Sequence, residues 1–211
     1  MLPTADASVK SAYIVSVATQ AERREGTRAR IVDHASEFFA TRGYNATSVD
    51  DIIAAAGISK GAMYHHFQKK EDVFAAVFVA TSSDAIRRAA AKVKPNLDPL
   101  DALVVGCLAW LDAVESEPTR RILLVDGPSV LGWDRARTLE EATSLGAVRG
   151  AVTRAVKADA MNVPSIDLAA RLINGVLTEA ALNIRPGDAT HRRRLRGTVE
   201  AMIRGLSTVP R

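Results

Sequence analysis

Cysteine is almost absent from this chain, and its scarcity excludes two kinds of structure. The 211 residues include one cysteine, Cys107, so neither an intrachain disulfide nor a cysteine-based zinc site can form. Cys107 lies in the apolar run LVVGCLAWL. Reactive thiols need an exposed, electropositive neighbourhood, so we expect a buried, inert thiol, with a redox sensor as the alternative.

Long apolar runs are also missing. No stretch of about 18 apolar residues occurs, so we expect no helix that spans a membrane. The N-terminus lacks a basic segment followed by a long apolar stretch and a small-residue cleavage site, and secretion is therefore not indicated. A cytoplasmic location follows by default.

Strand signals are scarce, and aromatic residues make up only 5% of the chain. Alanine, leucine, arginine and glutamate instead fill long segments at helical spacing, separated by glycine and proline. This pattern predicts an all-α protein of about nine helices. Four of the expected helices span residues 27–42, 134–158, 166–184 and 191–206.

What is present is typical of a globular protein with a sizeable core, at 47% hydrophobic and 25% charged residues. The formal net charge is +4 and the sequence pI is about 9.5. This balance is compatible with a nucleic-acid partner but does not establish one.

Residues 47–67 contain the capping and turn residues that are typical of two short helices joined by a tight turn. Ser48 and Asp51 have the spacing of a capping box at the start of the first helix, and Gly57 ends it. Ser59 is a suitable N-cap for the second helix. A short turn with glycine between two helices, preceded by a longer bracing helix, is the mark of a helix-turn-helix.

The second of these helices has one apolar and one polar side. Met63 and Phe67, four residues apart, anchor it, whereas Lys60, Gly61, Tyr64 and His65 fall on the other side. Alone, Tyr64 could instead cap the core with its ring. The adjacent histidines point about 100° apart and lack a third ligand nearby, so we expect no metal site.

Residues 27–75 resemble the DNA-binding domain of TetR-type transcriptional regulators. The similarity rests on ASEFFATRGYNATSVDDIIAAAGISKGAMYHHFQKKEDVF, residues 35–74, and more weakly on DGPSVLGW, residues 126–133. It implies an N-terminal extension over residues 1–25, a three-helix helix-turn-helix domain over 26–70, and a larger helical domain for effector binding and dimerisation over 71–211.

The resemblance also implies a function. Such proteins are homodimers that bind double-stranded, palindromic operator DNA and are most often repressors released by a small-molecule effector. By this resemblance, Lys60 and Gly61 approach base edges, and His65 lies along the groove. Tyr64 and His66 contact the DNA backbone or nearby bases. Phosphate is contacted by Thr47, Ser48 and Lys70. The full set of expected DNA contacts is Thr47, Ser48, Lys60, Gly61, Tyr64, His65, His66 and Lys70.

Two further surfaces follow from the apolar residues of the C-terminal part. The last two helices carry more apolar surface than one small domain covers, which predicts a four-helix bundle between two subunits. Its expected residues are Leu168, Leu172, Val176, Leu195, Val199 and Met202. We expect an effector cavity for a hydrophobic or aromatic ligand between the fifth to eighth helices, lined by Leu103, Cys107, Trp110, Leu124, Asp126, Trp133 and Val176, although both tryptophans could equally belong to the core.

No enzyme is expected, because no nucleophile lies at motif spacing from a base and no G-x-S-x-G elbow occurs. We expect no cofactor. Two alternatives remain: a helical small-molecule-binding protein or enzyme that does not bind DNA specifically, and a general DNA-compacting protein. The basic run HRRRLR at residues 191–196 favours a solvated helix face over a second nucleic-acid patch.

Overall fold

The computed structural model describes residues 7–207, with side chains from residue 20 onward, and this part of the chain is helical as expected. The N-terminal helices are α1 (Ala7–Arg42), α2 (Val49–Ala56), α3 (Lys60–His66) and α4 (Lys70–Ala90). The remaining elements are α5 (Pro99–Val114), α6 (Glu117–Arg120), the π-helix η1 (Arg121–Asp126), α7 (Gly127–Ala142), α8 (Ser144–Lys157), α9 (Ile166–Leu182) and α10 (Ala189–Arg204). The all-α class is confirmed.

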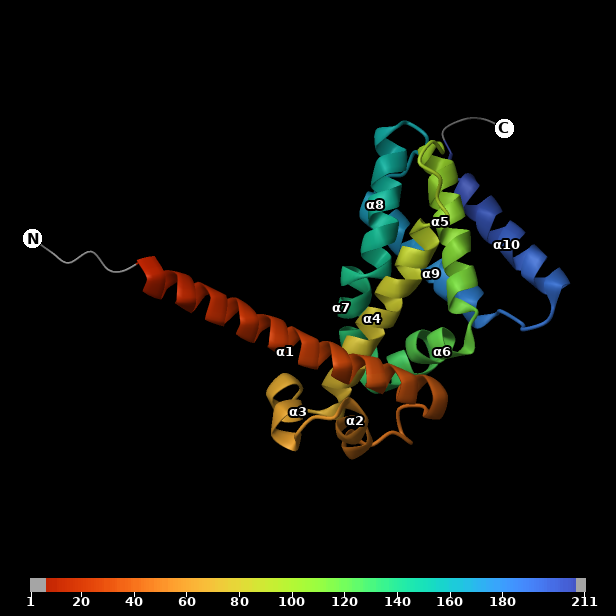
Figure 1. The fold of residues 1–211 in the computed structure, drawn as a ribbon. Coiled ribbons are helices and arrows are strands. Elements are labelled where there is room, and N and C mark those ends of the chain that lie inside the picture. The colour runs from red at the N-terminus through yellow and green to blue at the C-terminus, as the bar shows by residue number, and fades with distance from the viewer. Residues whose placement is uncertain (1–6, 208–211) are drawn as a thin grey trace, which may run out of the picture.

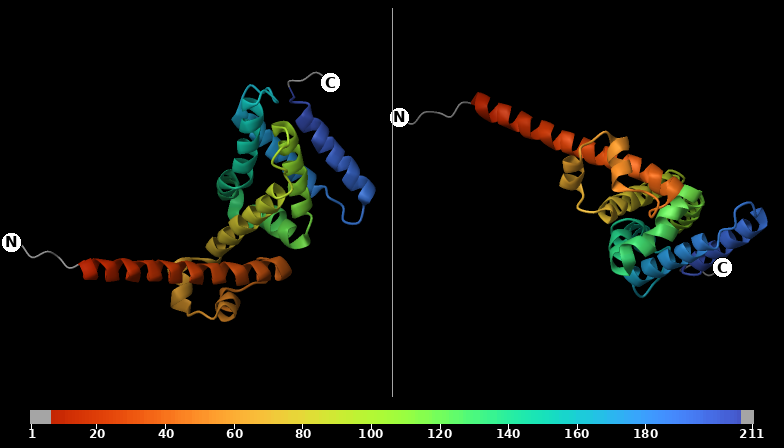
Figure 2. Two further views of the ribbon diagram at one scale, coloured as in Figure 1. Left: turned by 45° about the horizontal axis from the view of Figure 1, so that its top comes forward. Right: turned by 90° about the horizontal axis from the view of Figure 1, so that it is seen from below.

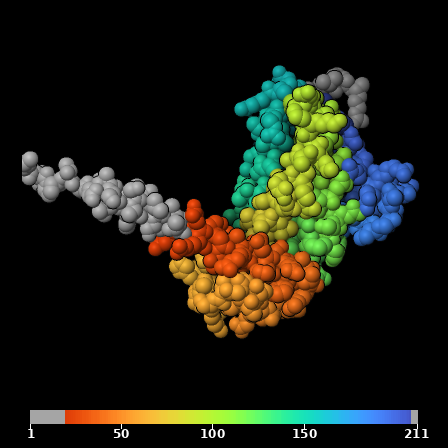
Figure 3. Space-filling view, in the orientation of Figure 1, coloured from red at the N-terminus to blue at the C-terminus, as the bar shows by residue number. Residues whose placement is uncertain are grey.

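The helices form two parts that share α4 (Figure 1). The long α1 lies across the molecule, with α2 and α3 on one side of it and the larger bundle on the other (Figures 1 and 2). The surface of α1 to α3 forms one end of the molecule (Figure 3). Because α4 starts beside α2 and α3 and continues into the bundle, it connects both parts mechanically.

The expected local signals at α2 and α3 are present. The Ser48 hydroxyl accepts a hydrogen bond from the Asp51 amide at 3.0 Å, and the Asp51 carboxylate accepts one from the Ser48 amide at 3.2 Å, which completes the capping box. Gly57 ends α2 with a φ of +62°, a conformation that glycine adopts without strain. The Ser59 hydroxyl caps α3 by accepting from the Ala62 amide. The helix-turn-helix is thus built from local hydrogen bonds.

An aromatic cluster packs α1 and the α1–α2 loop against α4. Phe39 and Phe74 are buried and meet edge to face with ring centroids 5.2 Å apart, and Tyr44 meets Phe74 at 5.3 Å. Met63 and Phe67 bury the inner side of α3 in the same core. The outer side of α3 is consequently left toward solvent.

The structure corrects two helix boundaries. Helix α1 begins at Ala7 rather than near residue 27, so it passes through the expected domain boundary at residues 25 and 26. Residues 1–6 of the expected extension lie outside the described residues. The single helix expected over 134–158 is two helices, because Thr143 leaves helical geometry (φ −124°, ψ −103°) and turns its hydroxyl back to the Leu139 carbonyl at 2.8 Å.

Side-chain contacts also fasten the bundle to the end of α1. Arg121 donates to the carbonyls of Ala40 and Thr41 at 3.2 and 3.0 Å, and the Asp126 carboxylate accepts from the Tyr44 amide at 3.1 Å. Both side chains come from η1. We call these two side chains, Arg121 and Asp126, with their three hydrogen bonds, the η1 clasp.

Candidate DNA-binding face and effector cavity

The outer side of α3 exposes the polar residues that the sequence pattern predicted. Lys60, Gly61, Tyr64 and His65 are exposed, and 47% of Tyr64 is accessible to solvent. Lys60 makes one ion pair, with Asp50 of α2 at 3.8 Å, and both side chains are largely exposed. Exposed pairs of this kind contribute little to stability, so Lys60 is free to exchange partners.

Gly61 is not required by the packing of the protein itself. A Cβ added there would meet a single neighbouring atom within 4 Å, the Ser59 hydroxyl at 3.9 Å, and Gly61 has an ordinary helical backbone. Glycine is unfavourable in a helix relative to alanine. Because Gly61 has no side chain, an external partner can approach the backbone of α3 closely at this position.

The two histidines of α3 have different surroundings. Their rings meet edge to face at 5.4 Å, but His65 is exposed whereas His66 is half-buried. Burial lowers the pKa of His66, and the nearby positive groups His65, Arg24 and Arg28 lower it further. His66 is therefore held toward its neutral form. Among residues 20–207, no group of three or more potential ligands could hold a metal ion.

Two expected phosphate contacts are turned inward. Thr47 is 1% exposed, and its hydroxyl donates to the Gly43 carbonyl at 2.9 Å, so its side chain is not available to DNA. The Lys70 ammonium donates to the carbonyls of Tyr44 and Thr47 at 2.9 and 3.0 Å and lies 4.0 Å from the centroid of the Tyr44 ring. Its contacts brace the α1–α2 loop from within. Ser48, by contrast, is exposed at the N-terminus of α2.

Two arginines of α1 lie beside α3, and the sequence analysis did not include them among the expected DNA contacts. Arg28 lies with its guanidinium carbon 5.4 Å from the centroid of the Phe67 ring, and Arg24 is close enough to affect His66 electrostatically. Both are exposed. Their spacing of four residues on a helix was a usable signal, because it places them on one face.

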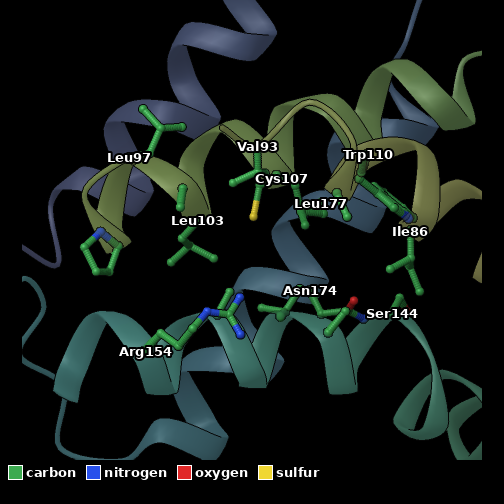
Figure 4. A pocket seen from close by; sticks show the side chains of 18 of the residues that line it. Ile86, Val93, Leu97, Leu103, Cys107, Trp110, Ser144, Arg154, Asn174 and Leu177 are labelled. Atoms are coloured by element: carbon green, nitrogen blue, oxygen red, sulfur yellow. The ribbon is translucent and has the colours of Figure 1, made fainter. Parts of the chain in front are cut away.

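A cavity of about 550 Å³ lies between α4, α5, α8 and α9, which is the size of a small-molecule site (Figure 4). Leu103, Cys107 and Trp110 lie on its wall, as expected. Burial raises the pKa of the Cys107 thiol to about 12, so this group is a neutral thiol at physiological pH. Neighbouring lining side chains are mostly apolar.

The other four expected wall residues lie outside the lining of this cavity. Asp126 belongs to the η1 clasp, and Trp133 is 74% exposed, next to a kink in α7 at Gly132. Leu124 packs against the core outside the cavity lining. Val176 points to a different surface of α9. Helical periodicity indicated that Leu124 and Val176 face apolar surroundings, but not which surroundings.

A second apolar surface lies along α9 and α10. Leu168, Leu172 and Met202 are largely exposed, and together with Val176 they line a groove of about 400 Å³. We call these four residues the α9–α10 groove. Val199 is 2% exposed and the partly buried Leu195 packs against the core, so both residues contribute to the packing of the subunit itself, and neither lines this groove.

A helix-turn-helix with an exposed polar face on α3, together with a separate and mostly apolar cavity, is the arrangement expected of a ligand-responsive DNA-binding protein. Two family models match the chain: "Bacterial regulatory proteins, tetR family" over residues 31–77, and "Tetracyclin repressor-like, C-terminal domain" over residues 100–206. The chain belongs to the TetR family of transcriptional regulators, and members of this family are regulators rather than enzymes.

Individual relatives agree with this family. The HTH-type transcriptional repressor KstR2 of Rhodococcus jostii is 36% identical over 96 residues, which cover 44% of this chain and 47% of KstR2. The regulator AcrR of Shigella flexneri is 33% identical over 107 residues, covering 50% and 49% of the two chains. The matched region is thus about half the length of these curated relatives.

Solved structures match over a larger share of the chain. A TetR-family regulator from Pectobacterium atrosepticum is 28% identical, covers 90% of this chain and 98% of its own, and has a TM-score of 0.74. The structure of RolR in complex with resorcinol shares the fold, with 18% identity, a TM-score of 0.69 and coverage of 90% and 97%. Within the described residues, no helix is both long and apolar enough to cross a membrane.

Proposed function

We propose that this protein is a homodimeric transcriptional repressor that binds a palindromic operator and leaves it when a small molecule occupies the cavity. The observation that carries the proposal is the polar, exposed side of α3, with an unobstructed Gly61 between Lys60 and Tyr64. A DNA-binding regulator acts where the DNA is, which places it in the cytoplasm.

The recognition step assigns different tasks to different residues. Lys60 reads base edges in the major groove, where each base pair has its own pattern of donors and acceptors. Tyr64, His65 and His66 lie along the groove or contact the backbone. Ser48 binds phosphate at the N-terminus of α2, where unpaired backbone amides favour an anion. Lys70 supports this surface from inside.

Arg24 and Arg28 extend the positive surface along α1. They flank α3 on the side of His66, and phosphate contacts from arginine position a protein on DNA without reading its sequence. We therefore add both residues to the proposed DNA-contacting set.

Dimerisation would occur through the α9–α10 groove. Exposed large apolar side chains in one continuous patch mark an interaction surface, and a two-fold axis would bring two copies of the same patch together. The two α3 helices of such a dimer would meet two half-sites of a palindrome.

Effector binding would reach the DNA through α4. Ile86, Ala89 and Val93, at and beyond the C-terminal end of this helix, line the cavity, and its first residue, Lys70, holds the α1–α2 loop. We take α4 to have two arrangements, one that binds DNA and one that does not. A ligand shifts the equilibrium between them only if it binds one arrangement more tightly than the other. The similarity to the transcriptional repressor KstR2 supports repression, rather than activation, as the role of the DNA-bound protein.

The test is selection of bound duplexes from a random DNA pool, followed by titration of the selected sequence and a scrambled duplex. We expect a palindromic consensus. Lys60→Ala should mainly lower the ratio of specific to non-specific affinity, by about 1–3 kcal/mol per site, and Tyr64→Ala should weaken both duplexes. Both side chains are exposed, so melting temperatures should change little.

Two outcomes would contradict the proposal. Enrichment of no sequence, with binding to every duplex alike, would identify a general DNA-compacting protein. Absence of DNA binding at low salt, with retained small-molecule binding, would identify a helical binding protein or enzyme instead.

A further inference from the structure

The charge on the cavity wall is of one sign. Its lining includes Lys94 and Arg154, and no aspartate or glutamate among the residues of the described cavity wall offsets them. The rest of the wall is dominated by apolar side chains of α4, α5 and α8. A cavity with this composition disfavours a cationic ligand, because nothing on its wall would neutralise that charge.

Arg154 is an exposed residue of the cavity lining, and its side chain has no partner among the described side chains. It rises from α8 with its guanidinium directed into the cavity, across from Leu103 on α5 (Figure 4). Among residues 20–207, its guanidinium makes neither a hydrogen bond nor an ion pair, whereas the guanidinium of Arg149, five residues earlier on the same helix, binds both Glu141 and Asp167. The positive charge of Arg154 is therefore available to a ligand.

A second unsatisfied donor lies at the far end of the same cavity. The Trp110 indole N–H is buried and finds no acceptor among the described residues. A buried donor without an acceptor is costly, and a ligand oxygen at this place would remove that cost. Asn174 and Ser144 add polar groups along the wall between the two ends (Figure 4).

We propose that the effector is an organic anion with an apolar body, whose acidic oxygens bind Arg154. The planar guanidinium matches a carboxylate with two parallel hydrogen bonds. Lys94 supports the same charge, the apolar wall covers the body of the ligand, and an acceptor on that body reaches Trp110. This inference rests on the proposed function, since it names the chemical class of the effector for the same cavity.

Binding is non-covalent in this proposal. The only thiol of the chain, Cys107, lies on the wall, and burial raises its pKa so that it is neutral at physiological pH. Recognition therefore depends on charge and shape, and both can be varied separately in the ligand.

The experiment uses two sets of ligands, and within each set the apolar body is kept while the charge differs. The first set is decanoate, decanamide and decylamine, and the second is 4-tert-butylbenzoate and its primary amide. Calorimetric titration and melting curves on the full chain give affinities. The Trp133→Phe variant leaves Trp110 as the one tryptophan, so its fluorescence reports whether the ligand enters the cavity. Trp133 is exposed, so this change leaves the cavity intact.

Two variants isolate the charge. Arg154→Gln removes the proposed anion contact, whereas Lys157→Gln removes one positive charge from an exposed site on the same helix outside the cavity wall. We expect at least one carboxylate to bind about tenfold or more tightly than its amide, since hydrogen bonds to charged groups are the stronger ones. Arg154→Gln should abolish that difference, and Lys157→Gln should preserve it.

The inference is overturned if no carboxylate binds, if the amides bind as tightly as the acids, or if Arg154→Gln leaves the preference unchanged. These results concern the ligand alone and are obtained without DNA. Failure to select an operator would contradict the regulator function while leaving the ligand class intact, so the two failures are distinguishable.

Discussion

At the scale of single residues, Gly61 gives the sharpest test of the reading helix. Gly61→Ala adds a methyl group into open space, and alanine is favoured over glycine in a helix by roughly 0.5–1 kcal/mol. The variant should therefore be as stable as the parent or slightly more stable, yet bind operator DNA less tightly, because the new Cβ stands where the DNA approaches. Thermal melting and duplex titration measure the two effects.

The matched control for Gly61 is Gly197→Ala. Gly197 lies within α10, is exposed, and a Cβ there would meet nothing within 4 Å, whereas a Cβ at Gly61 would meet only the Ser59 hydroxyl, at 3.9 Å. This variant should gain stability without any change in DNA affinity. If Gly61→Ala binds the operator as the parent does, the backbone of α3 does not come close to DNA.

Lys70 and Arg28 make a contrasting pair of basic residues. Lys70→Ala removes two partly buried hydrogen bonds to loop carbonyls and should lower the free energy of unfolding by about 1–3 kcal/mol, with little change in the salt dependence of DNA binding. Arg28→Ala should leave stability nearly unchanged but reduce the slope of log K against log salt concentration by roughly 0.9 for each phosphate that the protein no longer neutralises.

The expectation taken from the family resemblance, that Lys70 binds phosphate, makes the opposite prediction. If Lys70→Ala melts like the parent but shows a reduced slope of log K against log salt concentration, Lys70 does bind phosphate. The measurements are the same salt titrations and denaturant curves for both variants.

At the scale of elements, the η1 clasp depends on the π-helical turn. Arg121 and Asp126 are its first and last residues, and the i→i+5 bonding of a π-helix brings residues five apart toward one side. Gly127 then allows close packing, since a Cβ there would lie 2.8 Å from the Phe78 ring and 2.9 Å from the Ile122 carbonyl oxygen. This geometry aims both clasp residues at the end of α1.

Breaking the clasp should loosen the α1–α2 loop. Asp126→Ala leaves the Tyr44 amide without its acceptor, so hydrogen–deuterium exchange of a peptide covering residues 40–47 should accelerate. Asp126→Asn retains an acceptor oxygen and should exchange like the parent. Equal exchange in all three proteins would mean that the clasp does not restrain this loop.

At the scale of the whole molecule, we propose that the α9–α10 groove is the surface through which two subunits associate. Met202 is 53% exposed in the single subunit, so Met202→Asp should not disturb its fold, but it would bury an unpaired charge in a dimer. Such a charge costs several kcal/mol, and we expect monomers. Light scattering at several concentrations measures the mass.

Thr198→Asp is the control for this variant, because Thr198 is exposed on the same helix but does not line the groove. It adds the same charge and should remain dimeric. A Met202→Asp protein that is still a dimer would show that subunits associate through another surface.

The sequence by itself determined the helix-turn-helix, because every signal for it acts over a few residues. The Ser48 cap, the left-handed Gly57 and the spacing of Met63 and Phe67 specify two helices and their inner faces without reference to distant parts of the chain. The all-α class follows from the same local periodicity.

Only the tertiary structure decided what each inward-facing residue meets. Periodicity showed that Leu124, Val176 and Val199 avoid water. It did not show whether each faces the core, the cavity or the groove, because all three surroundings are apolar. The inward turn of Thr47 and Lys70 depends on carbonyls presented by the folded α1–α2 loop. A cavity is space that distant helices leave between them, and no local pattern specifies where that space lies.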